Sequence, residues 1–142
     1  MDMEEIILHD KAFVPYLTEV EIQNAIYDIA SQINAAYEGK EVLFLSVLNG
    51  AFMFTSDLMK KITLPCEISF IKVSSYSGTE STGRVDELIG LNTSVSGKHV
   101  IIIEDIVDTG KTLWEFLPQL MHQQPRSLKI CALLHKKEAT KF

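Results

Sequence analysis

The sequence has little cysteine and no long apolar run, and each absence excludes a class of protein. Its only cysteines, Cys66 and Cys131, lie far apart, each inside an apolar stretch. This excludes the disulfide framework of small secreted domains and favours a thiol-reducing compartment, with both thiols in the core. No apolar run approaches the ~20 residues that cross a bilayer, and the start, MDMEEIILHD, is acidic where a signal peptide is basic. We therefore expect a soluble, cytoplasmic protein with no membrane contact.

An excess of positive charge is also missing. The chain has 13 Lys and Arg against 19 Asp and Glu, a net charge of −6. Proteins that gain affinity by neutralising nucleic-acid phosphates usually carry a basic surplus or stripe. We therefore expect no nucleic-acid partner. The four histidines, at positions 9, 99, 122 and 135, show no metal-ligand spacing, so we assign them no metal site.

The remaining composition is that of an ordinary globular domain. The 142 residues are 46% apolar and 23% charged, without a repeat, a linker or a low-complexity tract. A chain of this length can bury roughly two thirds of its unfolded surface, so its core needs no disulfide or structural metal. We predict a single domain over residues 1–142.

Short apolar runs alternate with stretches of helical periodicity. The pattern predicts strands over residues 42–48, 66–73, 100–104 and 128–134, and helices over residues 21–37, 51–62 and 112–123. Thr18 and Glu21 form a capping-box pattern. Pro118 is expected to kink or shorten the third helix, and Trp114 to lie in the core. Residues 74–98 are too long for an ordinary connection and predict a functional lid or a disordered loop. The alternation predicts an α/β fold, a parallel sheet flanked by helices with ligands beyond the carboxyl ends of its strands.

The most informative segment, residues 100–112, reads VIIIEDIVDTGKT. An apolar strand runs into Glu104 and Asp105, and the following turn opens a helix whose backbone N–H groups can bind a phosphate. The P-loop pattern needs glycine where Asp105 stands, so a P-loop is excluded. Two carboxylates beside a phosphate need hydroxyls or Mg²⁺ as partners, and a phosphorylated ribose supplies the hydroxyls. The alternative is a capped helix after a buried strand, with both acids solvated in the loop.

The same segment resembles the signature of the type I phosphoribosyltransferases, which bind phosphoribosyl pyrophosphate (PRPP). Residues 47–58, 74–85 and 133–137 resemble hypoxanthine and hypoxanthine-guanine phosphoribosyltransferases in order and spacing. The resemblance extends from about residue 6 to residue 137. It implies one phosphoribosyltransferase-like domain with a long mobile loop.

The resemblance also implies roles for the residues after the third strand. Glu104 and Asp105 would hold the ribose hydroxyls, directly or through Mg²⁺, which makes them the expected metal ligands. Asp108 would be catalytic and handle the proton on the purine N7. The expected 5′-phosphate site consists of Asp108, Thr109, Gly110, Lys111 and Thr112.

Three other segments match the family's site. The turn that meets pyrophosphate, often through a non-proline cis peptide bond, corresponds to Leu48, Asn49 and Gly50. Ser75 and Tyr76 match the dipeptide on the mobile loop that closes over the reacting centre, and Lys136 matches the lysine that donates to the purine 6-oxo group. Taken singly, these features have simpler interpretations: a plain turn at 49–50, an exposed loop aromatic and a solvated strand end.

The sequence departs from the family in two places. Asn49 stands where some relatives carry lysine, which removes a point charge but leaves the backbone donors. The chain stops at Phe142, whereas the family continues through strands that supply a base-stacking aromatic, another metal-facing carboxylate and a pyrophosphate-facing arginine. We therefore expect a half-built base pocket with weak purine affinity, and a last strand that associates as a raw sheet edge.

Two hypotheses of function follow. The first is a purine salvage enzyme that transfers the phosphoribosyl group of PRPP to hypoxanthine, with guanine as a second candidate, giving IMP or GMP and pyrophosphate. The resemblance implies Mg²⁺ as cofactor and a homo-oligomer. The alternative is a catalytically incomplete module that binds PRPP or a nucleotide as a regulator or partner subunit.

Overall fold

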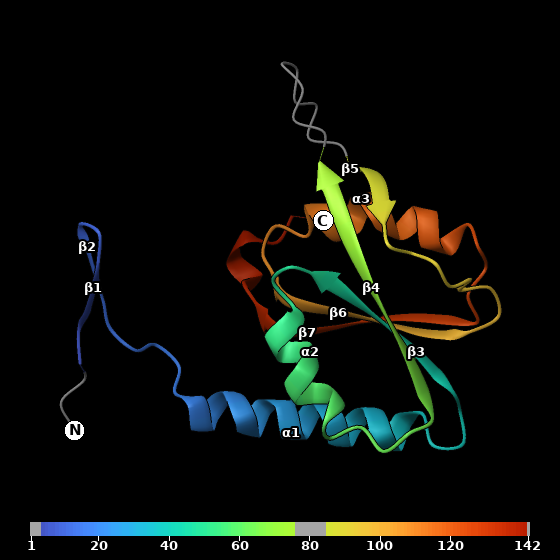
Figure 1. Cartoon of the computed structure of the whole chain (residues 1–142), viewed down its shortest axis with the longest axis horizontal. Coiled ribbons are helices and arrows are strands. Elements are labelled where there is room, and N and C mark those ends of the chain that lie inside the picture. The colour runs from blue at the N-terminus through green and yellow to red at the C-terminus, as the bar shows by residue number, and fades with distance from the viewer. Residues whose placement is uncertain (1–3, 76–84, 142) are drawn as a thin grey trace.

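The computed structural model describes residues 4–75 and 85–141, and it is built around a five-stranded sheet (Figure 1). The strand order is β5-β4-β3-β6-β7, with bounds Val85–Ile89, Cys66–Ser75, Val42–Leu48, His99–Val107 and Ser127–His135. Strands β4, β3, β6 and β7 are parallel to one another, and β5 is antiparallel to β4. The predicted α/β fold with a parallel sheet is therefore confirmed.

Helices cover both faces of this sheet. One face packs against α1 (Glu19–Ala36) and α2 (Phe52–Met59), and the other packs against α3 (Lys111–Met121) (Figure 1). Side chains of β3 alternate between these two cores: Phe44 belongs to the α1/α2 core and Leu45 to the α3 core, and both are fully buried. Because both faces of β3 pack against helices, its sequence is a continuous apolar run, as predicted for a strand buried on both faces.

Helix α1 begins where its capping box predicts. The backbone N–H of Glu21 donates to Thr18 Oγ1 over 3.2 Å, and the N–H of Thr18 donates to Glu21 Oε2 over 2.9 Å. The helix runs from Glu19 to Ala36, so it begins two residues earlier than its apolar periodicity indicated. The difference arises because the cap, not the first apolar residue, fixes the helix start.

Residues 74–98, predicted as a long connection, include the end of β4 and the whole of β5. Strand β4 extends to Ser75, and β5 pairs with it antiparallel, with Val73 opposite Leu88. The sequence of β5 is short, and two of its five residues are charged, so its strand character comes from pairing with β4 rather than from apolar periodicity. Residues 74–75 and 85–89 of the predicted loop therefore lie in strands, and the prediction of a lid stays untested.

Strand β6 is also longer than predicted, because it continues from Glu104 through Val107. The reason is its neighbour: β7 pairs with β6 as far as Val107, which lies opposite His135. Glu104 and Asp105 therefore lie within a strand, because the ladder with β7 continues past them through Ile106 and Val107.

Two predicted core residues lie at the surface. Cys66 is exposed at the start of β4, and Trp114 is 62% exposed because Leu113, Phe116 and Leu120 form the buried stripe of α3. Cys131 is buried, as predicted, and burial raises the pKa of its thiol to about 11. Helix α3 continues past Pro118 and ends two residues short of the predicted boundary.

Two small elements were not predicted. A hairpin of β1 (Ile6–Leu8) and β2 (Lys11–Phe13) lies apart from the sheet at the left of Figure 1, with its apolar side chains exposed. A short 3₁₀ helix, η1 (Lys137–Ala139), follows β7. Within the described ranges, no helix is both long and apolar enough to cross a membrane.

Candidate functional site

The candidate site lies where the two central strands end. Strands β3 and β6 are adjacent and parallel, so the turns after Leu48 and Val107 emerge at the same edge of the sheet. The backbone of Gly50 lies against the carboxyl group of Asp105, because a Cβ atom on this glycine would stand 2.6 Å from Asp105 Oδ2. Only glycine allows this approach without displacing the carboxylate. The structure thus brings the predicted pyrophosphate turn and the predicted ribose acids together.

The turn after β3 has the geometry that the resemblance implied. The peptide bond between Leu48 and Asn49 is cis. The N–H of Ala51 donates to the carbonyl of Val47 over 3.2 Å, and the N–H of Phe52 donates to the carbonyl of Asn49 over 3.3 Å. These two bonds lead the chain directly from the turn into α2.

The two acids lie within β6 and are not solvated loop residues. Glu104 is 8% exposed and Asp105 is half-buried. Burial, the neighbouring charge of Asp105 and a hydrogen bond with Asp105 raise the pKa of Glu104 to about 7. The alternative of two solvated loop carboxylates is therefore wrong for Glu104. Helix α3 begins at Lys111, and its N-cap residue, Gly110, makes no side-chain capping bond.

The turn between β6 and α3 encloses a small cavity. Its volume is about 130 Å³, and its lining includes Glu104 and the five predicted phosphate-site residues, Asp108, Thr109, Gly110, Lys111 and Thr112. Gly110 adopts a left-handed conformation, with φ of 85°, at the start of the helix. The N–H of Lys111 donates to Thr109 Oγ1 over 3.2 Å. Backbone N–H groups and the positive end of the α3 dipole therefore surround a space next to a buried carboxyl group.

The last described segment packs against the same turn. The N–H of Lys136, whose side chain is exposed, donates to the carbonyl of Val107 over 2.8 Å. Thr140 Oγ1 donates to the carbonyl of Asp108 over 2.9 Å. The predicted base-reading lysine is thus tied to the predicted phosphate turn. Sequence reasoning missed Thr140, because nothing in the sequence around it distinguishes it from a surface threonine.

The predicted loop dipeptide is only partly placed. Ser75 is the last residue of β4, at the same sheet edge as the other site segments. Tyr76 lies outside the described residues, so the expected closure of this loop stays a prediction.

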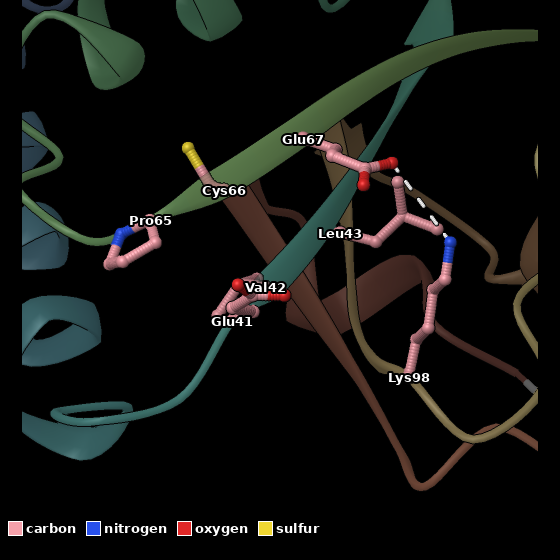
Figure 2. Close-up of a pocket in the computed structure, with 7 residues that line it drawn as sticks. All are labelled: Glu41, Val42, Leu43, Pro65, Cys66, Glu67 and Lys98. Atoms are coloured by element: carbon pink, nitrogen blue, oxygen red, sulfur yellow. Dashed lines mark ion pairs between the residues drawn. The ribbon is translucent and has the colours of Figure 1, made fainter.

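A larger pocket lies at the opposite end of the sheet (Figure 2). It has a volume of about 310 Å³ and is lined by Glu41, Val42, Leu43, Pro65, Cys66, Glu67 and Lys98. The Lys98 ammonium spans it to reach Glu67 at 4.0 Å. These residues lie at the amino ends of β3 and β4 and before β6, away from the turns that meet at Asp105. Ligands of parallel α/β sheets bind beyond the carboxyl ends of the strands, so this pocket at the amino ends is not the candidate site.

Comparison with known proteins identifies the family. The family model described as "Phosphoribosyl transferase domain" matches residues 17–142. The chain belongs to this phosphoribosyltransferase family. The match includes every segment of the candidate site.

The similar proteins are hypoxanthine-guanine phosphoribosyltransferases and related enzymes. The chain is 40% identical over 116 residues to a hypoxanthine-guanine-xanthine phosphoribosyltransferase of Tritrichomonas foetus. The match covers 82% of this chain and 63% of that protein. It is 41% identical over 130 residues to a hypoxanthine-guanine phosphoribosyltransferase of Staphylococcus aureus, covering 91% and 73%. The chain thus spans between about three fifths and three quarters of the length of these relatives.

Solved structures support the same family. A hypoxanthine-guanine phosphoribosyltransferase of Bacillus anthracis has a TM-score of 0.79 and 36% identity, and the match covers 89% of this chain and 73% of that one. A hypoxanthine phosphoribosyltransferase of Trypanosoma cruzi has a TM-score of 0.78 and 37% identity, covering 88% and 70%. The sequence-based prediction of the family is confirmed.

Proposed function

We propose that this chain takes part in purine salvage, transferring the phosphoribosyl group of PRPP to hypoxanthine, and to guanine as a second base, with release of pyrophosphate. One observation carries the proposal: the close approach of Gly50 to Asp105. It puts the turn after β3 beside the acid pair, while Glu104 of that pair lines the cavity of the turn after β6. Pyrophosphate, ribose and 5′-phosphate occupy the same order in PRPP.

Glu104 and Asp105 bind the ribose hydroxyls in this proposal, directly or through Mg²⁺. The donor set fits Mg²⁺, because two adjacent carboxylates offer the hard oxygen ligands that the ion prefers and substrate oxygens can complete its coordination. Their mutual repulsion, visible in the raised pKa of Glu104, would be relieved by a cation or by hydroxyl donors. When bound, Mg²⁺ neutralises charge that develops on the leaving pyrophosphate.

The 5′-phosphate lies in the cavity at the start of α3. Backbone N–H groups of the turn and the positive end of the α3 dipole attract the dianion, and the hydroxyls of Thr109 and Thr112 add donors. The turn after β3 offers its backbone donors to pyrophosphate, without the lysine charge that some relatives have at the position of Asn49. Ser75 and Tyr76 exclude water when their loop closes.

Asp108 and Lys136 act on the base. Lys136 donates to the purine 6-oxo group, and the carboxylate of Asp108 holds the N7 proton as the base approaches the ribose. Both side chains are exposed on segments joined by the hydrogen bond between Lys136 N–H and the Val107 carbonyl. Cleavage of the bond to pyrophosphate develops positive charge on the ribose, so orientation of the base and removal of its proton lower the barrier.

We also propose a cytoplasmic homo-oligomer that binds small molecules only. Cys66 and Cys131 are free thiols, which suits a reducing compartment. The T. cruzi structure concerns the role of that protein's C-terminal region in its oligomeric state and activity, so assembly and turnover are worth measuring together.

A turnover assay with hypoxanthine, PRPP and Mg²⁺ tests the function. We expect product formation by the chain and a 10²- to 10⁴-fold lower rate for Asp108→Asn, the usual contribution of a general acid–base group. Asp28→Asn, a matched change on the exposed face of α1, is expected to keep the parent rate. An Asp108→Asn rate within about twofold of the parent would refute the role of Asp108. Binding of PRPP without any turnover would instead favour the regulatory module, the alternative function.

A further inference from the structure

Three consecutive carbonyl groups of the phosphate turn accept hydrogen bonds from one segment of the chain. The carbonyls of Val107, Asp108 and Thr109 are bound by the N–H of Lys136, the hydroxyl of Thr140 and the N–H of Lys141, at 2.8, 2.9 and 2.9 Å. We call residues 136–141 the turn clamp. Two of its three bonds come from the backbone, and only the bond from Thr140 depends on a side chain.

The clamp determines where the N–H groups of the turn point. In a trans peptide the carbonyl and the following N–H point in opposite directions, and these peptides are trans. Carbonyls held toward the clamp therefore turn the N–H groups of residues 108, 109 and 110 away from it. The cavity at the start of α3 is lined by Glu104 and residues 106–113, with no residue of the clamp. A second cavity, of about 490 Å³, lies on the clamp side, since its lining includes Thr140 and Gly110. From the orientation of the carbonyls we take the N–H groups of residues 108–110 to face the first cavity rather than the second.

The hydroxyl of Thr140 is fully engaged in this arrangement. It donates to the Asp108 carbonyl, has the Lys136 carbonyl as a longer second acceptor at 3.2 Å, and lies 2.9 Å from His135 Nε2. Since a hydroxyl has a single proton, the imidazole N–H donates to the oxygen. One side chain thus links the backbone of Asp108 to that of Lys136, the two residues proposed to act on the base.

We propose that Thr140 is a positioning residue that aims the turn's N–H groups at the 5′-phosphate of the substrate. The proposal rests on the proposed function, because it assumes that this cavity receives the phosphate. Thr140 itself does not contact the substrate. Its effect passes through the peptide between Asp108 and Thr109, so phosphate binding depends on it and pyrophosphate binding at the turn after β3 does not.

Calorimetry with two separate probes tests the inference. Ribose 5-phosphate reports on the turn after β6, and Mg²⁺-pyrophosphate reports on the turn after β3. We expect Thr140→Val to weaken ribose 5-phosphate binding by roughly 3- to 10-fold, the value of one hydrogen bond, and to leave the pyrophosphate Kd within about twofold. Thr140→Ser restores the hydroxyl and should restore the affinity. Thr63→Val, an exposed threonine before β4 at the other end of the sheet, is the matched control.

Equal affinities of Thr140→Val and the parent for ribose 5-phosphate would overturn the inference, as would an equal loss for both probes, which indicates general destabilisation. A parent chain that binds neither probe would overturn the proposed function and the inference with it. If Thr140→Val does not fold, NMR of the parent chain still tests the inference. On titration with ribose 5-phosphate, the amide NMR signals of residues 108–110 should shift, and unshifted signals at saturation would overturn the inference.

Discussion

Glu104, a residue of the candidate site, lowers the free energy of unfolding at neutral pH. Its carboxyl group is buried at the end of β6 beside Asp105, which raises its pKa from an ordinary value of 4.5 to about 7. The native state therefore holds this proton more tightly than the unfolded state does. As pH rises from about 4.5 to 7, the unfolded chain ionises first, and the free energy of unfolding falls. Above about pH 7 Glu104 is ionised in both states, and its effect on the free energy of unfolding no longer changes with pH.

The variant Glu104→Gln should remove this pH dependence. It keeps the shape and hydrogen-bonding capacity of a neutral carboxyl group without the charge. We expect a gain in unfolding free energy on the order of 1–3 kcal/mol at pH 8 and no gain at pH 4.5. Urea denaturation at both pH values measures the difference, and Glu38→Gln, an exposed change at the end of α1, is the control. A gain of the same size at both pH values would contradict the electrostatic origin.

Ser46 is a second residue whose environment gives a prediction. It is fully buried in β3, lies opposite Ile103 and Phe70 in the sheet, and shares a 2.7 Å hydrogen bond with Thr55 of α2. Ser46→Ala would leave the Thr55 hydroxyl buried without this partner, at a cost of about 1–3 kcal/mol. Replacing both residues, Ser46→Ala with Thr55→Val, should recover part of the loss. A double variant less stable than the single one in urea denaturation would refute this account.

Individual side chains differ in how far the sequence predicts their place. Glu104, Asp105 and Gly50 were predictable because a strand followed by acids, and a turn of Asn and Gly, are local patterns. The contact between Gly50 and Asp105 was not, because it depends on β3 and β6 being neighbours in the sheet. Thr140 reaches Asp108 from far along the chain, and no local pattern predicts such a bond.

At the scale of elements, the cap of α1 is expected to be important for stability. Both capping-box bonds between Thr18 and Glu21 are formed, and α1 supplies Ile26, Ala30 and Ile33 to one core. Thr18→Ala removes the side-chain acceptor and should lower the unfolding free energy by about 1 kcal/mol. Thr18→Ser keeps the oxygen and is expected to lose less. Thermal unfolding followed by circular dichroism would show the order parent, serine, alanine, and a reversed order would contradict the capping role.

The elements that the sequence predicted well are those with two independent local signals. Helix α1 has both periodicity and a cap, and β3 has both an apolar run and a terminating turn. Strand β5 has neither, because its pairing partner rather than its own side chains makes it a strand. The end of β6 extends beyond the predicted boundary for the same reason, since β7 still pairs with Ile106 and Val107 after the two acids.

At the scale of the whole molecule, β7 forms an outer strand of the sheet in the described part of the chain. Its Ile130 is 44% exposed, and such edges pair with other chains. We expect association that rises with concentration, measured by sedimentation velocity, and a weaker tendency in Ile130→Lys. Val20→Lys makes a similar change on the exposed surface of α1 and should associate like the parent. A parent that stays monomeric at every concentration would contradict the prediction.

The central place of β3 has a consequence for the rate at which the protein folds. This strand pairs on both sides, and its partner β6 begins far along the chain: Val42 lies opposite His99. Neither neighbour can be reached through a tight hairpin, because parallel pairing requires a crossover. The chain must therefore close long loops, at an entropic cost, before the central ladder contributes any favourable contact. Folding should be slow for a chain of this size, with the closure of β6 onto β3 as the step that limits it.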